Sequence, residues 1–366
     1  MIGRKIKNKK MQLKKIQDAD LKEKRVLMRA SFNIPFEGNK IKENYKIKSV
    51  KKTLDYIIAE GGKVTMMSNL GRPLEYHKNN PGSEWSSKFS FRNILPEIAE
   101  KLGITIGFIP SCNVSVILKH HNEFSEKYDA FLLENIRFYK EEKKNDQEFS
   151  ASLAKNFDVF VNESFSDCHR NYVSTNGVAK KLPSFAGFQL QEEIKNLTKV
   201  KEYPEHPAVA IIGGAKIETK LPLIETLSDS YDFILVGGKI ANEAIDQYIN
   251  FKTNVIMPVD FVDKNRFDIG SHTIKEFSKI ISQAETIVWN GPMGMFEKKP
   301  FDKGTRAILG AIVKSGAFAV VGGGESIQAV NESGLMDKLD FVSTGGGAML
   351  KFLSGSEMPG LESLKE

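Results

Sequence analysis

The chain has 366 residues, enough for two ordinary domains at roughly 150 residues each. Hydrophobic residues make up 41% and charged residues 27%, a composition typical of globular proteins and unlike that of disordered chains. Two cysteines exclude a secreted disulfide framework and favour a reducing cytoplasm, and no apolar run approaches the ~18 residues of a membrane span. The formal net charge of +6 is balanced by 46 interspersed acidic residues, so nucleic acid is only a weak alternative partner.

The first half of the chain begins with a basic stretch, Arg4 to Lys15, which we interpret as a solvated extension because no apolar segment of a secretory signal follows it. Short β-rich runs then alternate with longer amphipathic segments, a pattern that predicts strands covered by helices. The predicted strands are residues 25–28, 63–68, 130–133 and 159–161, and helices are expected at 47–60 and 91–102.

The second half repeats this alternation, and four of its predicted strands end in glycine. These strands are residues 209–212, 233–236, 287–289 and 318–321, and a further cluster, 345–347, is predicted to open the last helix. The fold class is therefore α/β, with two Rossmann-like parallel-sheet domains. We place a hinge at residues 181–188, where the pattern breaks before a charged helix at 191–201, so the domains are expected at 1–185 and 186–349.

Polar side chains follow the predicted strands of the first half, where ligands bind in doubly wound sheets. Arginine offers a planar fork that matches phosphate or carboxylate, so several converging arginines suit a small molecule that carries both groups. Any single one could be a solvated surface charge, but four at equivalent positions favour an anion site. The residues are Arg29, Asn33, Asn69, Arg72, Asn135, Arg137, His169 and Arg170.

The glycine loops of the second half leave backbone N–H groups open to nucleotide phosphates, and Lys216 and Lys220 follow the first of them. Neither a P-loop nor a dinucleotide-binding fingerprint is present, and no histidine pair has metal-ligand spacing. His120 and His121 are expected to be exposed. An anion site and a phosphate cradle on two hinged domains predict phosphoryl transfer across a closing cleft.

Eight motifs make the sequence specific enough to compare with a family. They are RASFNIP at 29–35, SNLGRP at 68–73, LENIRFY at 133–139, HR at 169–170 followed by ST, GGAKIETK at 213–220, VWNGPMGMFE at 288–297, VGGGES at 321–326 and STGGGA at 343–348. In this order and spacing, the chain resembles the phosphoglycerate kinase family from about residue 21 to 364.

The resemblance implies a monomeric, cytoplasmic enzyme that interconverts 1,3-bisphosphoglycerate plus ADP with 3-phosphoglycerate plus ATP. It assigns 3-phosphoglycerate to the first domain and Mg²⁺ with ATP or ADP to the second, with residues about 350–366 returning to the first domain. The implied acid-binding residues are Arg29, Ser31, Asn33, Asn69, Arg72, Arg137, His169 and Arg170. The implied nucleotide-binding residues are Lys216, Lys220, Gly238, Asn290, Glu297, Gly323, Gly324, Glu325 and Ser326, with Glu325 on magnesium. The implied catalytic residues are Lys46, Lys220, Gly346 and Gly347.

The chain departs from the family pattern at several of these positions. Lys46 stands where the family has an arginine, Ser31 where it has an aspartate, Asn69 where it has a histidine and Glu325 where it has an aspartate. Further departures are Ser166, Asp167, Cys168, Tyr172 and Lys239. Two alternatives therefore stay open: a kinase of the same fold that acts on another small acid, and a catalytically weakened relative that binds nucleotide. A nucleic-acid-binding role for the basic N-terminus ranks below both.

Overall fold

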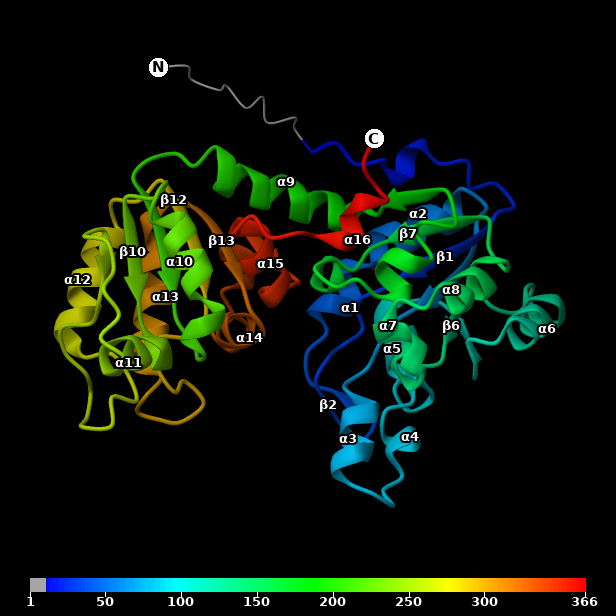
Figure 1. Cartoon of the computed structure of the whole chain (residues 1–366), viewed down its shortest axis with the longest axis horizontal. Helices are drawn as coiled ribbons and strands as arrows, with labels where there is room; N and C mark the ends of the chain where they lie inside the picture. The colour runs from blue at the N-terminus through cyan, green and yellow to red at the C-terminus, as the bar shows by residue number, and fades with distance from the viewer. Residues whose placement is uncertain (1–10) are drawn as a thin grey trace. The chain divides into compact units, whose positions relative to one another are not determined.

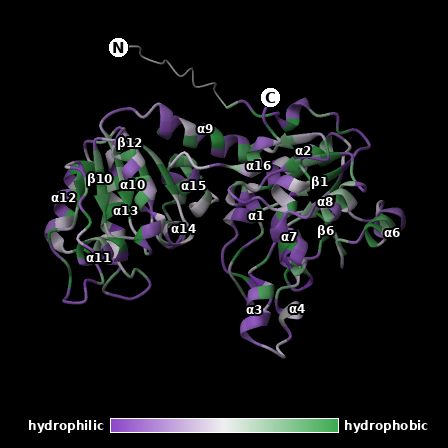
Figure 2. Ribbon diagram, in the orientation of Figure 1, coloured by the Kyte–Doolittle hydropathy of each residue, from purple (hydrophilic) through white to green (hydrophobic). Residues whose placement is uncertain are grey.

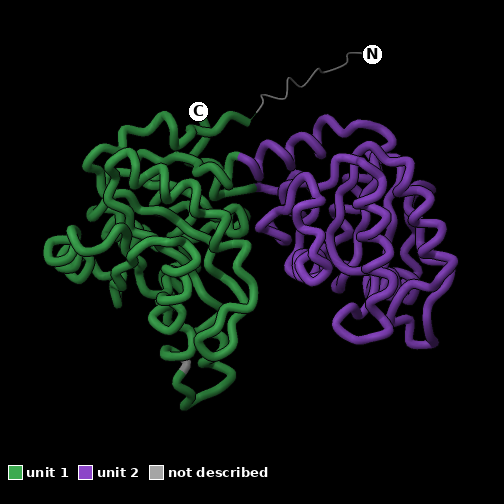
Figure 3. Tube along the Cα trace, turned by 180° about the vertical axis from the view of Figure 1, so that it is seen from behind, with its two compact units in different colours: residues 1–191, 358–366 green, residues 192–357 purple. Residues whose placement is uncertain are grey.

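The structure is a computed structural model that describes residues 11–366, with only the backbone of Trp85 (Figure 1). The chain divides into two compact units (Figure 3). Unit 1 contains the chain up to Gln191 together with Met358–Glu366, and unit 2 is Glu192–Glu357. The division falls inside one continuous helix, α9 (Phe188–Glu202), and not at residues 181–188.

Unit 1 is built on a six-stranded parallel sheet in the order β5-β6-β4-β1-β7-β8. The four predicted strands are present as β1 (Arg25–Arg29), β4 (Lys63–Met67), β6 (Ala130–Leu133) and β7 (Val159–Asn162). Two strands were not predicted, β5 (Ile106–Ile109) and β8 (Ser184–Ala186). β8 lies within residues 181–188, the range of the predicted hinge, and pairs with β7.

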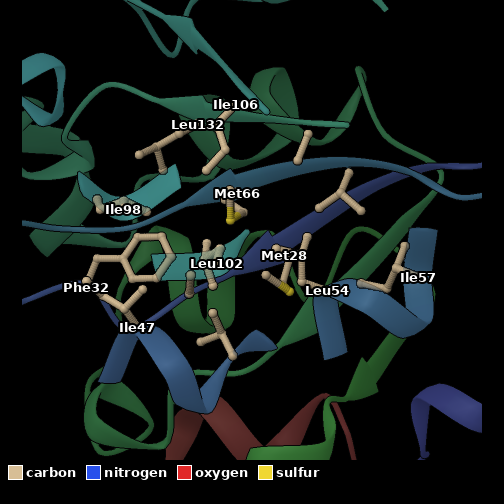
Figure 4. Packing of buried hydrophobic residues seen from close by; sticks show 14 of the residues in the cluster. Met28, Phe32, Ile47, Leu54, Ile57, Met66, Ile98, Leu102, Ile106 and Leu132 are labelled. Atoms are coloured by element: carbon tan, nitrogen blue, oxygen red, sulfur yellow. The ribbon is translucent and has the colours of Figure 1, made fainter. Parts of the chain in front are cut away.

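Helices cover both faces of this sheet, so its strands are apolar on both sides. One face packs Met28, Met66 and Leu132 against helix residues such as Leu54 and Leu102 (Figure 4). The elements are α1 (Tyr45–Ser49), α2 (Lys51–Ala59), α3 (Pro73–Asn79), α4 (Trp85–Lys88), α5 (Leu95–Leu102), α6 (Val114–Phe124), α7 (Lys140–Lys144), α8 (Gln147–Ala154) and α16 (Pro359–Glu362), a hairpin of β2 (Phe36–Glu37) and β3 (Lys40–Ile41), 3₁₀ turns η1 (Ile16–Asp18), η2 (Phe91–Asn93), η3 (Ile136–Phe138) and η4 (Phe165–Asp167), and the π turn η5 (Val173–Gly177).

Both ends of the described chain pack onto unit 1. Leu13 is buried and forms an antiparallel bridge with Lys365, and Lys15 bridges to Ala186 of β8. The predicted solvated extension is thus wrong for its described part, residues 11–15, because backbone pairing holds this segment. The remainder of the extension, from Arg4 to Lys10, lies outside the described residues.

Unit 2 contains a second six-stranded parallel sheet, in the order β11-β10-β9-β12-β13-β14. Its predicted strands are β9 (Ala208–Ile212), β10 (Phe233–Val236), β12 (Thr286–Asn290) and β13 (Phe318–Gly322), whereas β11 (Val255–Ile256) and β14 (Phe341–Ser343) were missed. The helices and turns are α10 (Leu221–Leu227), α11 (Gly238–Asp246), α12 (Ser271–Ile281), α13 (Lys303–Ser315), α14 (Gly324–Glu332), α15 (Gly346–Leu353), η6 (Ile217–Thr219) and η7 (Met336–Lys338). The 345–347 cluster opens α15 as predicted, although α16 follows and is the last helix.

Apolar strands form the interior of the sheets, as the green β10 shows (Figure 2). In unit 2 the fully buried Trp289 of β12 packs with Val321, Phe277 and Ile308. Each sheet is therefore a rigid platform whose carboxyl edge positions the loops that follow it. No helix among residues 11–366 is both long and apolar enough to cross a bilayer.

Candidate active site

Three predicted arginines meet in unit 1 at the carboxyl ends of the sheet strands. Arg29 ends β1, Arg137 lies in η3 after β6, and Arg170 follows β7 and η4. All three form ion pairs with the carboxylate of Asp167. We call these four residues the arginine cluster.

Arg29 is the centre of the cluster and is only 1% exposed. Its Nε donates to Ser174 Oγ at 3.0 Å, and one Nη donates to the carbonyl of Ala30 and to Ser68 Oγ. The other Nη donates to Asn69 Oδ1 at 2.6 Å and to Asp167 Oδ2 at 3.0 Å. Since a guanidinium has five N–H donors, every donor of Arg29 is already engaged within the protein.

Asp167 lies between the three guanidinium groups and is 5% exposed. Its Oδ1 is 3.3 Å from Arg137 Nη2 and 3.8 Å from Arg170 Nε. Burial opposes ionisation of this carboxyl, but Arg29, Arg137 and Arg170 outweigh it and lower the pKa of Asp167 below its usual value. Asp167 is therefore a carboxylate, and it neutralises part of the positive charge of the cluster.

A second buried carboxyl, Glu142, supports Arg29 from behind. It accepts hydrogen bonds from the backbone N–H of Ser174 at 2.9 Å and from Ser174 Oγ at 2.5 Å. Burial raises the pKa of Glu142, and the charge of Arg29 opposes this effect. Ser174 thus links Glu142 to Arg29 and fixes the orientation of the guanidinium.

Two buried donors beside the cluster have no hydrogen-bond partner: Asn69 Nδ2 and Arg137 Nε. Asn69 is fully buried, and its Oδ1 already accepts from Arg29, so its amide N–H₂ is the free end. A buried donor without a partner costs free energy, and a ligand that brings an acceptor would remove that cost.

The loop at Gly71 joins other predicted residues to the cluster. Its carbonyl accepts from Arg137 Nη1 at 3.0 Å, and its N–H donates to Asn33 Oδ1 at 2.9 Å. Lys46 Nζ in turn donates to the carbonyl of Asn33 at 3.3 Å. Gly71 has φ +60°, and a Cβ there would lie 2.5 Å from the ring of Phe89, so only glycine fits.

The remaining predicted residues of unit 1 lie around this core. The side chain of Arg72 is 71% exposed and pairs with Glu75 at 3.4 Å, so it is the one predicted arginine outside the cluster. Ser31 is buried, and its hydroxyl lies 2.8 Å from Ser166 Oγ. His169 is half-buried next to Arg170, and its charge helps to lower the pKa of Asp167.

The prediction for His120 and His121 was wrong, because both rings are half-buried in α6. The ring of His121 packs against Phe131, and its Nε2 lies 2.8 Å from Oγ1 of Thr65. Burial, with a contribution from Arg25, lowers the pKa of His121 to about 4. This ring is therefore neutral and part of the packing.

In unit 2 the glycine loops after β9, β10 and β12 pack backbone against backbone. A Cβ on Gly213 would collide with the carbonyl of Pro292, and one on Gly238 would lie 2.6 Å from the same oxygen. Gly346, at the start of α15, packs against Gly323 in the same way, with 2.5 Å to its Cα. These glycines let the loops at the strand ends approach closely.

Lys220 and Asn290 lie at the centre of these loops. Lys220 is 7% exposed and donates to Asn290 Oδ1, while Asn290 Nδ2 donates to the carbonyl of Gly322 at 2.8 Å. Burial lowers the pKa of Lys220 to about 8, against the opposing charge of Glu325. Ser326 is also buried, and its hydroxyl accepts from the N–H of Gly291 at 2.7 Å, so it holds the loop in place.

Other predicted nucleotide residues line a pocket of about 550 Å³ in unit 2. Glu297 and Glu325 lie on its wall with Gly214, and Lys239 lies there too. Gly324 and Gly347 face open space, because a Cβ on either would meet no atom within 4 Å. Lys216 is exposed at the start of η6. The pocket and the open glycines at the N-termini of α14 and α15 form a surface that suits phosphate groups.

Comparison with known proteins identifies the family. The family model described as phosphoglycerate kinase matches residues 16–252 and 244–356. The chain belongs to the phosphoglycerate kinase family. A phosphoglycerate kinase of Finegoldia magna is 37% identical over 403 residues, which cover 97% of this chain and 100% of the relative. One of Borreliella burgdorferi is 34% identical over 401 residues, with the same coverage of both chains.

Solved phosphoglycerate kinase structures agree with this assignment. The enzyme of Pyrococcus horikoshii matches with a TM-score of 0.84 and 29% identity, covering 96% of this chain and 98% of that one. The enzyme of Coxiella burnetii matches with a TM-score of 0.77 and 30% identity, covering 96% and 99%. The predicted family and the predicted two-sheet α/β fold are confirmed, and the family is one of phosphotransferase enzymes.

Sequence reasoning missed the residues that hold the phosphoglycerate kinase arginines in place. Asp167 was noted only as a departure from the family pattern, and neither Glu142 nor the side chain of Ser174 was expected at the site. Ser174 belongs to the ST pair that follows the HR motif at 169–170, and this motif was the sequence signal that could have identified it. Glu142 gave none, because it occurs in the charged helix α7 and its burial arises from packing against η5.

Proposed function

We propose that this chain catalyses reversible phosphoryl transfer between 1,3-bisphosphoglycerate and ADP, giving 3-phosphoglycerate and ATP. One observation carries the proposal: in a chain of this family, an arginine cluster ends one parallel sheet and close-packed glycine loops end the other. The first suits a small acid with phosphate and carboxylate groups, and the second suits a nucleotide.

The acid is proposed to bind through Asn69, Arg137 and Arg170. Asn69 Nδ2 and Arg137 Nε are the unpartnered donors, and Arg170 is the most exposed of the three clustered arginines, with 38% of its side chain accessible. Arg29 contributes charge and orients Asn69, since its own donors are engaged. Arg72, Asn33, Ser31 and His169 border this region and complete the proposed acid site.

The nucleotide is proposed to bind in the unit 2 pocket, with Glu297 toward the ribose and Lys216 toward the phosphates. Asn290, Gly238, Gly323, Gly324 and Ser326 shape the loops that receive it. Magnesium binds in proteins through one or two carboxylates together with substrate phosphates, and Glu325 fits this use because it is exposed on the pocket wall beside Gly214. With the nucleotide bound, the ion would neutralise phosphate charge next to Glu325.

The catalytic roles fall to groups that stabilise charge on the transferred phosphoryl group. Lys220 supplies a buried positive charge, and Gly346 and Gly347 supply N–H donors at the N-terminus of α15. Lys46 is proposed to donate to the phosphoryl group carried by the acid substrate in unit 1. No acid or base side chain is needed, because phosphoryl transfer depends on positioning and charge.

The cellular setting is also part of the proposal. We propose a cytoplasmic monomer that acts on small molecules and binds neither nucleic acid nor membrane. Two free, buried cysteines are consistent with a reducing compartment. Size-exclusion chromatography with light scattering would test the monomer.

A substrate panel tests the proposed acid. The purified chain with Mg-ATP is offered 3-phosphoglycerate, glycerate, 2-phosphoglycerate and acetate, and ADP formation is measured by a coupled assay. We expect the highest kcat/KM for 3-phosphoglycerate. A clear preference for another acid would reject 3-phosphoglycerate as the substrate but would still support kinase activity. If none of the four acids is phosphorylated, the proposal that this chain is a kinase is rejected.

A further inference from the structure

Asp167 occupies a position inside the arginine cluster that a bound anion would also favour. Three guanidinium groups surround its carboxylate, and its two oxygens face different partners. Oδ2 accepts from Arg29 Nη2 at 3.0 Å and from Ser164 Oγ at 3.2 Å, whereas Oδ1 accepts from Arg137 Nη2 at 3.3 Å. The carboxylate therefore uses donors that could otherwise serve a ligand.

Two buried donors beside Asp167 remain without a partner. Arg137 Nε and Asn69 Nδ2 are buried without a partner, and each Nη of Arg137 donates one hydrogen bond, to Gly71 or to Asp167. Glu142 adds a second carboxyl behind Arg29, through Ser174. Two carboxyl groups thus oppose the three guanidinium charges. Asp167 contacts all three groups directly, whereas Glu142 is linked to Arg29 through Ser174.

We propose that Asp167 is a built-in counter-ion that sets the charge selectivity of the arginine cluster, weakening its affinity for divalent anions more than for monovalent ones. This inference rests on the proposed function only in taking the cluster as the acid site. A carboxylate in contact with a bound anion repels it in proportion to the charge of that anion. Three guanidinium groups with one carboxylate in contact remain net positive, so Asp167 reduces the preference of the cluster for a dianion over a monoanion without reversing it.

Asp167→Asn tests the proposal, because asparagine keeps the shape and one acceptor oxygen but removes the charge. The matched control is Asp158→Asn: Asp158 also pairs with an arginine, Arg25, at 3.4 Å, but away from the cluster. The probes are inorganic sulfate and formate, and the affinity of each is measured from the rise of Tm with its concentration, at constant ionic strength. This readout does not depend on activity.

We expect Asp167→Asn to bind sulfate at least about tenfold more tightly than the wild type, with a smaller gain for formate. Asp158→Asn should respond to sulfate as the wild type does. This comparison accounts for the general stabilising effect of sulfate on folded proteins. Asp167→Glu keeps the charge and should bind sulfate no more tightly than the wild type. An unchanged sulfate affinity in Asp167→Asn, or a gain in Asp167→Glu, would overturn the proposal.

Folding of the variant is itself informative. If Asp167→Asn folds only when sulfate is present, the anion has replaced the carboxylate, which supports the inference. If it stays unfolded even with sulfate, Asp167 is required for folding and the inference fails. Loss of all turnover in the wild type would reject the proposed function but would leave the sulfate comparison valid.

Discussion

At the scale of single residues, the site depends on charges held where water cannot reach them. Lys220 illustrates the cost: burial opposes its charged form, so its pKa is lowered to about 8, and Glu325 limits that fall. A lysine that must be protonated to stabilise a phosphoryl group is then sensitive to mildly alkaline pH.

The pKa of Lys220 can be measured directly by ¹³C NMR of labelled lysine side chains. We expect one lysine to titrate near pH 8, and its signal to be absent in Lys220→Arg. Glu325→Gln should lower this pKa further, because it removes the carboxylate that opposes the fall, and Glu332→Gln should leave it unchanged. A titration near pH 10.5 would show that Lys220 is not desolvated.

Lys46 is the second residue whose chemistry predicts a measurable effect. It is half-buried on α1 and makes one hydrogen bond, to the carbonyl of Asn33. Arginine at this position would keep the charge and add a planar fork, so we expect Lys46→Arg to raise kcat by about tenfold. Lys48→Arg, on the same helix but exposed, is the control and should leave kcat unchanged. Equal rates for Lys46→Arg and the wild type would place the transferring phosphoryl group away from this residue.

At the scale of elements, the carboxyl ends of two parallel sheets collect the functional residues. Apolar runs predicted eight strands because a strand covered on both faces is continuously hydrophobic. β5 was missed because Gly107 interrupts its short run, yet glycine is required there, since a Cβ would lie 2.6 Å from the ring of Phe131. β11 and β14 are only two and three residues long, and so give no periodic signal.

Part of the unit 1 site was predictable, because the carboxyl ends of parallel strands meet at one edge of the sheet and bring the residues that follow them together. Four arginines were expected to converge, and three of them, Arg29, Arg137 and Arg170, do so, whereas Arg72 pairs with Glu75 outside the cluster. Asp167 was not expected as their partner, because Arg29 is 138 residues away in sequence and Arg137 is 30. Such pairings depend on tertiary packing, which local patterns do not contain.

The glycines that open α15 provide a matched pair of substitutions. Gly346→Ala would place a Cβ 2.5 Å from the Cα of Gly323, whereas Gly347→Ala would meet no atom within 4 Å. We expect Gly346→Ala to lower the free energy of unfolding by about 1–3 kcal/mol, and Gly347→Ala to leave it nearly unchanged. Urea unfolding measures both. Equal stabilities would show that the loops do not pack backbone against backbone.

At the scale of the whole molecule, unit 1 is assembled from both ends of the chain. α16 returns to it, where Gly360 N–H donates to the carbonyl of Cys168 at 2.8 Å, and Leu361 and Leu364 are fully buried. Cys168 directly follows Asp167, so the C-terminal segment supports the loop that carries the arginine cluster. Unit 2 takes no residue from this segment.

Leu361→Ala tests this assembly. Removing the buried side chain should destabilise unit 1 by about 2–5 kcal/mol. Lys365→Ala is the control, because its partly exposed pair with Glu362 contributes about 0–1 kcal/mol. Nucleotide affinity should be the same in both variants, since unit 2 is unchanged. A loss of nucleotide affinity in Leu361→Ala would contradict the division into units.

The most direct test of the account is ATP formation from 1,3-bisphosphoglycerate and Mg-ADP by the wild type and by Lys220→Ala. If a buried lysine stabilises the transferred phosphoryl group, the wild type forms ATP and the variant is slower by roughly 10² to 10³. A wild type that forms ATP no faster than Lys220→Ala would contradict the assignment of this chain as a phosphotransferase acting through Lys220.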